Sequence, residues 1–168
     1  MSLNLANMLQ TSIQFRNQFN YEHQVAVRPE EGLRMDYVSL NVALAELASS
    51  MGWYRLGESV PEVDQATLLK QYIDVLNHVF WVAARQTWSH LIVLDDEKLK
   101  ALVAKRPAKS LSQQFLATQH FLDQSLFERQ QAAFEHAWHL ILKLGLVDLH
   151  FDQDQIETTY LTTFKPKA

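Results

Sequence analysis

The stretch YIDVLNHVFWVA at residues 72–83 is the most informative part of the chain. Nine of its twelve residues are apolar or aromatic, and the exceptions are Asp74, Asn77 and His78. In a helix these three residues and Trp81 follow the i, i+3, i+4, i+7 spacing of a single face. A carboxylate that leaves water without a partner either loses several kcal/mol or takes up a proton. The pattern therefore predicts a helix with one polar stripe and a partner for Asp74.

The composition limits the classes of protein to consider. With 168 residues, 48% of them hydrophobic, the chain can bury a core as one domain over residues 1–168. The net charge of −4 argues against a nucleic-acid polymer as partner, because such binding needs a basic surface. The absence of cysteine excludes disulfides, thiolate metal sites and a cysteine nucleophile. Without a membrane span or a signal-peptide pattern, we expect a soluble, cytoplasmic protein that has no membrane partner.

The first half of the chain has a helical period. Apolar residues from Leu5 onward predict a first helix. Asp36 is expected to be the N-cap of a second helix that ends at Met51, where Gly52 closes it. A third helix is expected from near Gln65 to about Trp88.

The second half is also expected to be helical. Residues 89–104 predict mostly helix, with a short extended piece as the alternative. Either Ser110 or Ser112 is expected to cap a long helix that reaches Gly145, with an interruption near Ser125. A last helix is expected to begin near residue 152 or 154. No strand-like alternation of useful length occurs, so we expect an all-α fold: an antiparallel bundle of about five to six helices.

Two acids on the central helices are candidates for chemistry. Glu46 shares a helical face with Ala43, and Asp74 shares one with Gln71. Two antiparallel helices joined by about a dozen residues pack side by side, so each would offer one acid to a common cleft. Oxygen ligands of this kind suit Mg²⁺. The alternative is structural: Asp74 accepts hydrogen bonds within the core, and Glu46 is simply solvated.

The order of three segments resembles a known family. NLANMLQTSIQFRNQFN, LNVALAELASSMGWYRLGE and LLKQYIDVLNHVFWVA are similar to the dimeric all-α dUTPases, relatives of the MazG-like nucleotide pyrophosphatases, over residues 3–85. In that family the second helix carries Glu-x-x-Glu with a Trp seven residues later, and the third carries Glu-x-x-Asp. These four acids bind Mg²⁺ and position water for attack between the α and β phosphates. The resemblance implies a homodimer that binds a nucleotide or another small phosphorylated ligand.

The metal ligands of the family are only half present. Glu46 matches the second acid of the first pair, and Trp53 follows seven residues later. Asp74 matches the aspartate of the second pair. Ala43 and Gln71 stand where the other two acids are expected. The resemblance therefore implies that Glu46 and Asp74 are the catalytic and metal-binding residues of a weakened Mg²⁺ site, in which Gln71 orients a ligand or water.

The expected substrate contacts are also reduced. The family's basic cluster of W-K-x-W-K form reads WYRLG here, which leaves Arg55 to neutralise phosphate. Asn77 stands where the family often has His, and its amide is expected to read a base edge by hydrogen bonding. Trp53 or Trp81 would help to hold the base. Three acids of the loop between the second and third helices, Glu58, Glu62 and Asp64, are further candidates to complete the metal site. The alternative, which is favoured, is that they are plain surface charges.

Three functions are compatible with these residues. The first is an active Mg²⁺-dependent nucleoside triphosphate pyrophosphohydrolase similar to dUTP diphosphatase, with activity that is reduced or lost. The second is a module that binds a nucleotide or a small anion without hydrolysis. The third is a dimeric interaction protein in which the polar stripe is only structural. A separate pair, His136 and His139, has the spacing of two metal ligands, but no third ligand is specified and a plain amphipathic helix is favoured.

Overall fold

The computed structural model describes residues 3–57 and 62–166, and all regular structure in these ranges is helical. Seven α-helices are present there, so the all-α prediction is confirmed and the expected number of five to six was too low. Their bounds are α1 Leu5–Glu22, α2 Pro29–Met51, α3 Gln65–Gln86, α4 Asp96–Val103, α5 Leu111–Phe127, α6 Gln131–Lys143 and α7 Gln153–Thr163. A 3₁₀ turn, η1 (Ser89–Leu91), and a π-helical turn, η2 (Leu144–Asp148), complete the set.

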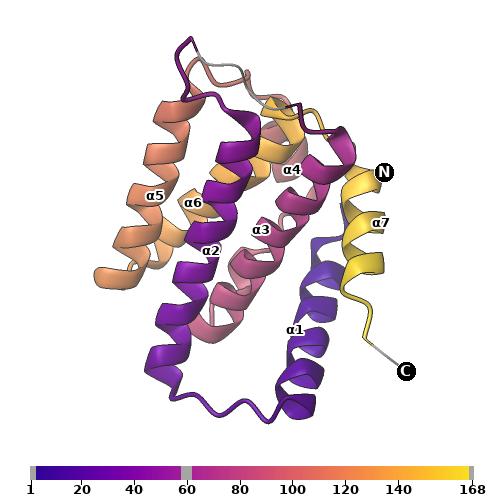
Figure 1. Ribbon diagram of the computed structural model, residues 1–168, viewed down its shortest axis with the longest axis vertical. Coiled ribbons are helices and arrows are strands. Elements are labelled where there is room, and N and C mark those ends of the chain that lie inside the picture. Colours follow the sequence, from indigo (N-terminus) through magenta and orange to yellow (C-terminus); the bar gives the residue numbers. More distant parts are fainter. Residues whose placement is uncertain (1–2, 58–61, 167–168) are drawn as a thin grey trace.

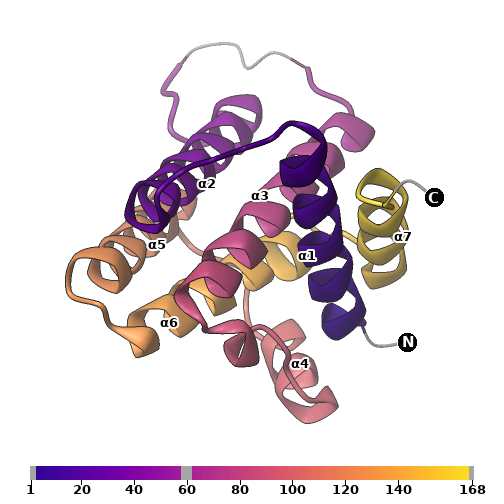
Figure 2. The ribbon, with the colours of Figure 1, turned by 90° about the horizontal axis from the view of Figure 1, so that it is seen from below.

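Helix α3 is the centre of the bundle. Figures 1 and 2 show α2 on one side of it and α1, with α7 beyond, on the other. Helices α5 and α6 form a second pair, and α6 lies across the inner side of α3 (Figure 2). Tyr72, Ile73, Leu76 and Phe80 of α3 are fully buried in this core. Burial of a large apolar side chain stabilises a fold by about 1.5–3 kcal/mol.

Local capping explains most helix starts. Side chains of Asp64, Ser110 and Asp152 accept hydrogen bonds from backbone N–H groups at the starts of α3, α5 and α7. These contacts confirm the expected starts at Gln65, Ser110 and Asp152. Helix α2 ends at Gly52, whose φ of 69° is the left-handed conformation that glycine adopts without strain.

The start of α2 was predicted wrongly. The helix begins at Pro29, seven residues before the expected cap, and Glu30 and Glu31 occupy its first turn. Proline suits the first helical position because the missing N–H has no partner there, and acids near the N-terminus interact favourably with the helix dipole. Asp36 therefore lies inside α2, where it is free to take a different role.

The long helix expected between residues 110 and 145 is divided. Helix α5 ends at Phe127, and Arg129 adopts a positive φ of 53° before α6 begins. The segment 89–104 contains η1 and α4, which cover 11 of its 16 residues, so the expectation of mostly helix is confirmed. At η2, a Cβ on Gly145 would lie 2.1 Å from Tyr72 Cζ. The absence of a side chain at Gly145 lets Tyr72 approach closely enough to donate its hydroxyl hydrogen to the Ile141 carbonyl.

The described N-terminal residues pack on α7. The backbone N–H of Leu3 donates to Gln153 Oε1, and that of Asn4 donates to Glu157 Oε1. Over the described residues, none of the helices combines the length and the apolar character needed to cross a bilayer.

Candidate functional site

The polar stripe of α3 is present in part, because Asn77, which the spacing also placed on it, lies in the core. Asp74 is its exposed member, and the others are half-buried. Gln71, Asp74, His78 and Trp81 follow one face of α3, opposite the side that is buried in the core. Asp74 is exposed, so the expectation of a carboxylate taken out of water was wrong.

Glu46 and Asp74 influence each other across the two helices. Glu46 is exposed on α2, and α2 packs along α3. The pKa of Asp74 is raised above its ordinary value, first by partial desolvation and second by the negative charge of Glu46. Within the described ranges, neither carboxylate forms an ion pair or a side-chain hydrogen bond. Two unpaired carboxylates that repel each other are an arrangement that a bound cation would stabilise.

Gln71 adds a third oxygen to this acidic end. Its Oε1 atom is buried and, among the residues that the structure describes, accepts no hydrogen bond. A buried acceptor without a partner loses about 1–3 kcal/mol, so a ligand or a water molecule is the natural donor here. Ala43, in contrast, is only 5% exposed and packs in the core. Over residues 3–57 and 62–166 no group of three or more His, Cys, Asp or Glu side chains is arranged to hold a metal.

Two ring nitrogens continue the stripe along α3. His78 Nδ1 and Trp81 Nε1 are buried, and within the described part of the chain neither has a hydrogen-bond partner. Their rings pack edge to face with centroids 5.3 Å apart. Burial lowers the pKa of His78, and this outweighs the opposing effect of the charge on Asp36. His78 is therefore neutral near pH 7, with one ring nitrogen available to a ligand.

A buried ion-pair cluster lies beyond these rings. Asp36 accepts two hydrogen bonds from Arg16, at 3.0 and 2.7 Å, and one from Arg85 Nε at 2.7 Å. The Asp36 side chain is only 7% exposed. The Arg16 guanidinium also lies 4.7 Å from the centre of the Trp81 ring. We call Arg16, Asp36 and Arg85 the arginine clamp, because it joins α1, α2 and α3 at one end of the stripe.

Gly32 makes room for the arginine clamp. A Cβ at this position would lie 2.5 Å from Arg85 Nη1. The glycine is thus explained by the approach of Arg85 and not by a turn, since it lies inside α2. Sequence reasoning missed both arginines, because Asp36 was interpreted as a cap. The available signal was an acid in the middle of the helical period of α2.

Asn77 is a core residue. It is 2% exposed, and its Oδ1 accepts hydrogen bonds from Ser12 Oγ at 2.9 Å and Tyr160 Oη at 2.8 Å. These contacts tie α1, α3 and α7 together. The amide oxygen that was expected to read a base is therefore used inside the bundle.

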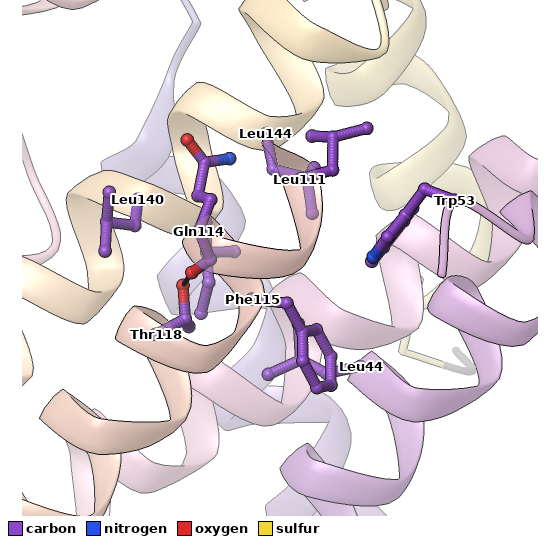
Figure 3. Close-up of a pocket in the computed structure, with 9 residues that line it drawn as sticks. Leu44, Trp53, Leu111, Gln114, Phe115, Thr118, Leu140 and Leu144 are labelled. Atoms are coloured by element: carbon purple, nitrogen blue, oxygen red, sulfur yellow. Dashed lines mark hydrogen bonds between the residues drawn. The ribbon is translucent and has the colours of Figure 1, made fainter. Parts of the chain in front are cut away.

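Trp53 faces away from the polar stripe. Figure 3 shows it beside Leu44 and Phe115, over a cavity bordered by α2, α5 and α6. Its ring centroid lies 6.1 Å from that of Phe115. The cavity is small, about 10 Å³, and mostly apolar, so it suits packing more than ligand binding.

The remaining candidates lie outside the stripe. Arg55, on the α2–α3 connection, donates from Nε to the Tyr54 hydroxyl at 3.4 Å. Glu58 falls outside the described residues. His136 stacks on Phe121 with centroids 4.1 Å apart, and burial lowers the pKa of His139. These contacts are those of histidines at the boundary of a packed helix.

Comparison with known proteins gives a match that covers nearly the whole chain. A search of curated proteins and a search of solved structures each gave no match. A family model described as dUTPase matches residues 3–165, which includes both α2 and α3 and extends through α7. This coverage is nearly complete and agrees with the resemblance seen in the first half of the sequence. The chain therefore belongs to the all-α, MazG-like dUTPase family.

Proposed function

We propose that this protein is a Mg²⁺-dependent nucleoside triphosphate pyrophosphohydrolase of the dUTP diphosphatase type, with slow catalysis. Membership of the dUTPase family supports dUTP as the first substrate to test. One observation carries the proposal: Glu46 and Asp74 lie on neighbouring helices without partners, and the charge of Glu46 raises the pKa of Asp74. A pair of this kind does not stabilise the fold, so it calls for a ligand.

The donor set fits a hard cation. Two carboxylates and the Gln71 amide oxygen are all oxygen ligands, and Mg²⁺ commonly takes one or two carboxylates together with waters and substrate phosphates. When bound, Mg²⁺ neutralises phosphate charge and polarises the phosphoryl group. Glu46 and Asp74 would hold the cation.

The protein side chains have separate roles in the proposed reaction. Gln71 Oε1 accepts a hydrogen bond from water and keeps it beside the acids. Asp74 would hold the cation, so the proton of that water would pass to the solvent. Attack at the α phosphorus breaks the bond to the β phosphate and releases pyrophosphate.

The other end of the stripe is suited to the nucleoside. His78 Nδ1 and Trp81 Nε1 offer hydrogen bonds to a base, which is the role first expected of Asn77. The Arg16 guanidinium borders the same place through its contact with Trp81. Arg55 is the proposed phosphate contact on the α2–α3 connection.

Slow catalysis follows from the two replaced acids. Ala43 offers no ligand, and the neutral amide of Gln71 is a poorer cation ligand than a carboxylate. Phosphoryl transfer depends mainly on positioning and electrostatic stabilisation. Loss of one preorganised electrostatic contact lowers kcat by about 10²–10³ in other active sites.

The test is pyrophosphate release from dUTP and dCTP with and without Mg²⁺. We expect slow, Mg²⁺-dependent release that Glu46→Gln and Asp74→Asn abolish. Asp123→Asn is the matched control, because Asp123 is an exposed acid on α5. Gln71→Glu restores a carboxylate. It should lower the Mg²⁺ concentration needed for half-maximal activity about tenfold or more, which corresponds to about 1.4 kcal/mol of binding free energy. Absence of release under all these conditions contradicts the hydrolase proposal.

The second candidate function is nucleotide binding without hydrolysis. The unpaired atoms of Gln71, His78 and Trp81 favour it, because they await a ligand whether or not chemistry follows. A rise in Tm with dUTP, without turnover and lost in His78→Ala, would support binding alone. No response to any nucleotide would leave only a helical scaffold.

A further inference from the structure

A groove between α2 and α5 lies apart from the α3 stripe. Figures 1 and 2 show these two helices side by side, and they run antiparallel. The groove encloses about 840 Å³, which falls within the usual range of about 300–1,000 Å³ for small-molecule sites. Among the described residues, none that lines it belongs to the α3 stripe. The groove is therefore a separate candidate site, independent of the proposed hydrolase chemistry.

Aromatic side chains form part of the wall of the groove. The Tyr37 hydroxyl is hydrogen-bonded to Ser125 at 2.9 Å, and the Trp88 ring packs on Phe134 with centroids 5.4 Å apart. Both rings are therefore held in place before a ligand arrives. Phe127, at the end of α5, also lines the groove and is 78% exposed. A wall of this kind suits the ring of an aromatic ligand.

One polar atom at the groove has no partner. Asn41 lines the groove and is half-buried, and its Oδ1 atom is buried. Within the described ranges this oxygen accepts no hydrogen bond, which is unfavourable for a buried polar atom. The terminal torsion of an asparagine turns easily, so Oδ1 can rotate toward the groove. A ligand that brings a hydrogen-bond donor would satisfy it.

The charged residues of the groove are divided between its two ends. The Tyr37–Ser125 hydrogen bond fixes the register of the antiparallel helices. In this register Asn41 and Asp123 lie on one side of the bond, toward the end of α2 and the start of α5. The other charged residues that line the groove lie on the opposite side: Glu30, Arg34 and Arg129.

The end of the groove near Asn41 favours a cation. Asp123 is exposed there and, among the described residues, is the one charged group that lines this end. At the opposite end the charges cancel, because Arg34 is paired with Glu31 at 3.2 Å and Glu30 is opposite in sign to Arg129. A ligand with a positive group at one end of an apolar body would match this distribution.

We propose that the groove binds an aromatic amine, with its protonated amino group at Asn41 and Asp123 and its ring against the aromatic wall. The amino group donates hydrogen bonds to Asn41 Oδ1 and to the Asp123 carboxylate, and hydrogen bonds between charged groups are stronger than neutral ones. The faces of aromatic side chains also attract a cation. A metal ion does not fit, because over the described residues no group of three or more His, Cys, Asp or Glu side chains is arranged to hold one.

The first test is calorimetric titration of the full chain with three indoles whose side chains end in different charges. Tryptamine is positive, tryptophol is neutral and indole-3-propionate is negative. We expect saturable binding of tryptamine, about tenfold or more tighter than that of tryptophol, because the alcohol cannot form charge-assisted hydrogen bonds. Indole-3-propionate should bind most weakly. No saturable binding of tryptamine, or equal affinity for tryptamine and tryptophol, overturns the proposal.

Two substitutions test the two parts of the site. Asn41→Leu removes the acceptor with little change in size and should weaken tryptamine binding about tenfold. Urea unfolding should show that its fold is kept, because the lost oxygen had no partner among the described residues. Phe127→Ala should weaken tryptamine and tryptophol by the same factor, since both have the ring. Leu116→Ala is the matched control, because Leu116 is 66% exposed on α5 and does not line the groove. Wild-type affinity of Asn41→Leu for tryptamine contradicts the proposal.

The place of binding is tested by NMR on the isotope-labelled full chain. Tryptamine should shift the amide signals of residues 30–41 and 123–129, which contain most of the groove. Shifts gathered at Glu46, Asp74 and Trp81 instead would show that the amine binds at the α3 stripe and would overturn the proposal. Pyrophosphate release is not part of either measurement, so the two proposals can fail separately.

Discussion

The two ends of the α3 stripe each have an aspartate, and the two differ in burial and in hydrogen-bond partners. Asp36 is buried and accepts three hydrogen bonds from two arginines. Asp74 is exposed, has no partner in the described chain, and faces the like charge of Glu46. The same side chain thus fixes the helices at one end and opposes its neighbour at the other. Acids that the fold itself satisfies hold the bundle, whereas acids that it leaves unsatisfied mark the place for a ligand.

The largest effect is expected at the arginine clamp. Asp36→Asn removes the negative charge between Arg16 and Arg85 and leaves both guanidinium groups partly buried without compensation. Breaking a buried ion pair by removing one partner destabilises proteins by about 3–5 kcal/mol. Urea unfolding followed by circular dichroism should show a loss in this range. A loss below about 1 kcal/mol, typical of surface pairs, would remove the contrast between the two ends.

The same substitution at the acidic end should have little effect on stability. Burial and Glu46 raise the folded pKa of Asp74 above its ordinary value, so the folded state holds this proton more tightly than the unfolded state. That contribution to stability is fully present below the ordinary pKa and is lost as pH rises through the raised folded pKa. Asp74→Asn should therefore equal wild type near pH 3 and exceed it slightly near pH 7, by a few tenths of a kcal/mol for an exposed group.

The measurement for Asp74→Asn is the same urea titration at several pH values. A loss of stability in Asp74→Asn near pH 7 that disappears near pH 3 would show the opposite sign and would mean that Asp74 has a hidden partner. Asp123→Asn, at an exposed acid on α5, controls for the general effect of the substitution.

The smallest expected effect is that of the Glu46 charge on the pKa values of its neighbours. Its charge raises the pKa of Asp74 and also that of His78, so Glu46→Gln should lower both. The change at His78 should be the smaller, because Glu46 is the last of the influences on its pKa. NMR titration of the His78 ring and of the Asp74 carboxyl measures both values. Unchanged pKa values would mean that Glu46 and Asp74 do not interact, and this would weaken the metal-site proposal.

Most of the fold follows from local sequence signals. Ser110, Asp152 and Gly52 have clear capping chemistry, and the structure confirms each of them. The break at Arg129 was not predicted in place, because neither glycine nor proline marks it. Such breaks depend on how α5 and α6 pack together, which the local pattern does not contain.

The candidate site was less accessible to prediction. Helical spacing placed Asp74, Asn77, His78 and Trp81 on one face. The prediction was wrong for Asn77, which lies in the core, and spacing alone did not say how far the face is buried. Hydrophobic neighbours suggested burial of Asp74, whereas the structure leaves its side chain exposed. The role of Asp36 depends on Arg16, from a helix twenty residues earlier, and on Arg85, from a helix forty-nine residues later. Long-range ion pairs of this kind leave no local pattern.

The arginine clamp also makes the two ends of the stripe opposite in charge. Two negative charges at Glu46 and Asp74 stand at one end, and an excess of one positive charge stands at the other, about 16 Å away along the helix axis from Asp74 to Arg85. A field with this separation acts on an approaching molecule before any contact forms. The two acids alone repel the negative end of an elongated solute, so the phosphates of a nucleotide would reach Glu46 and Asp74 only together with a cation that offsets their charge.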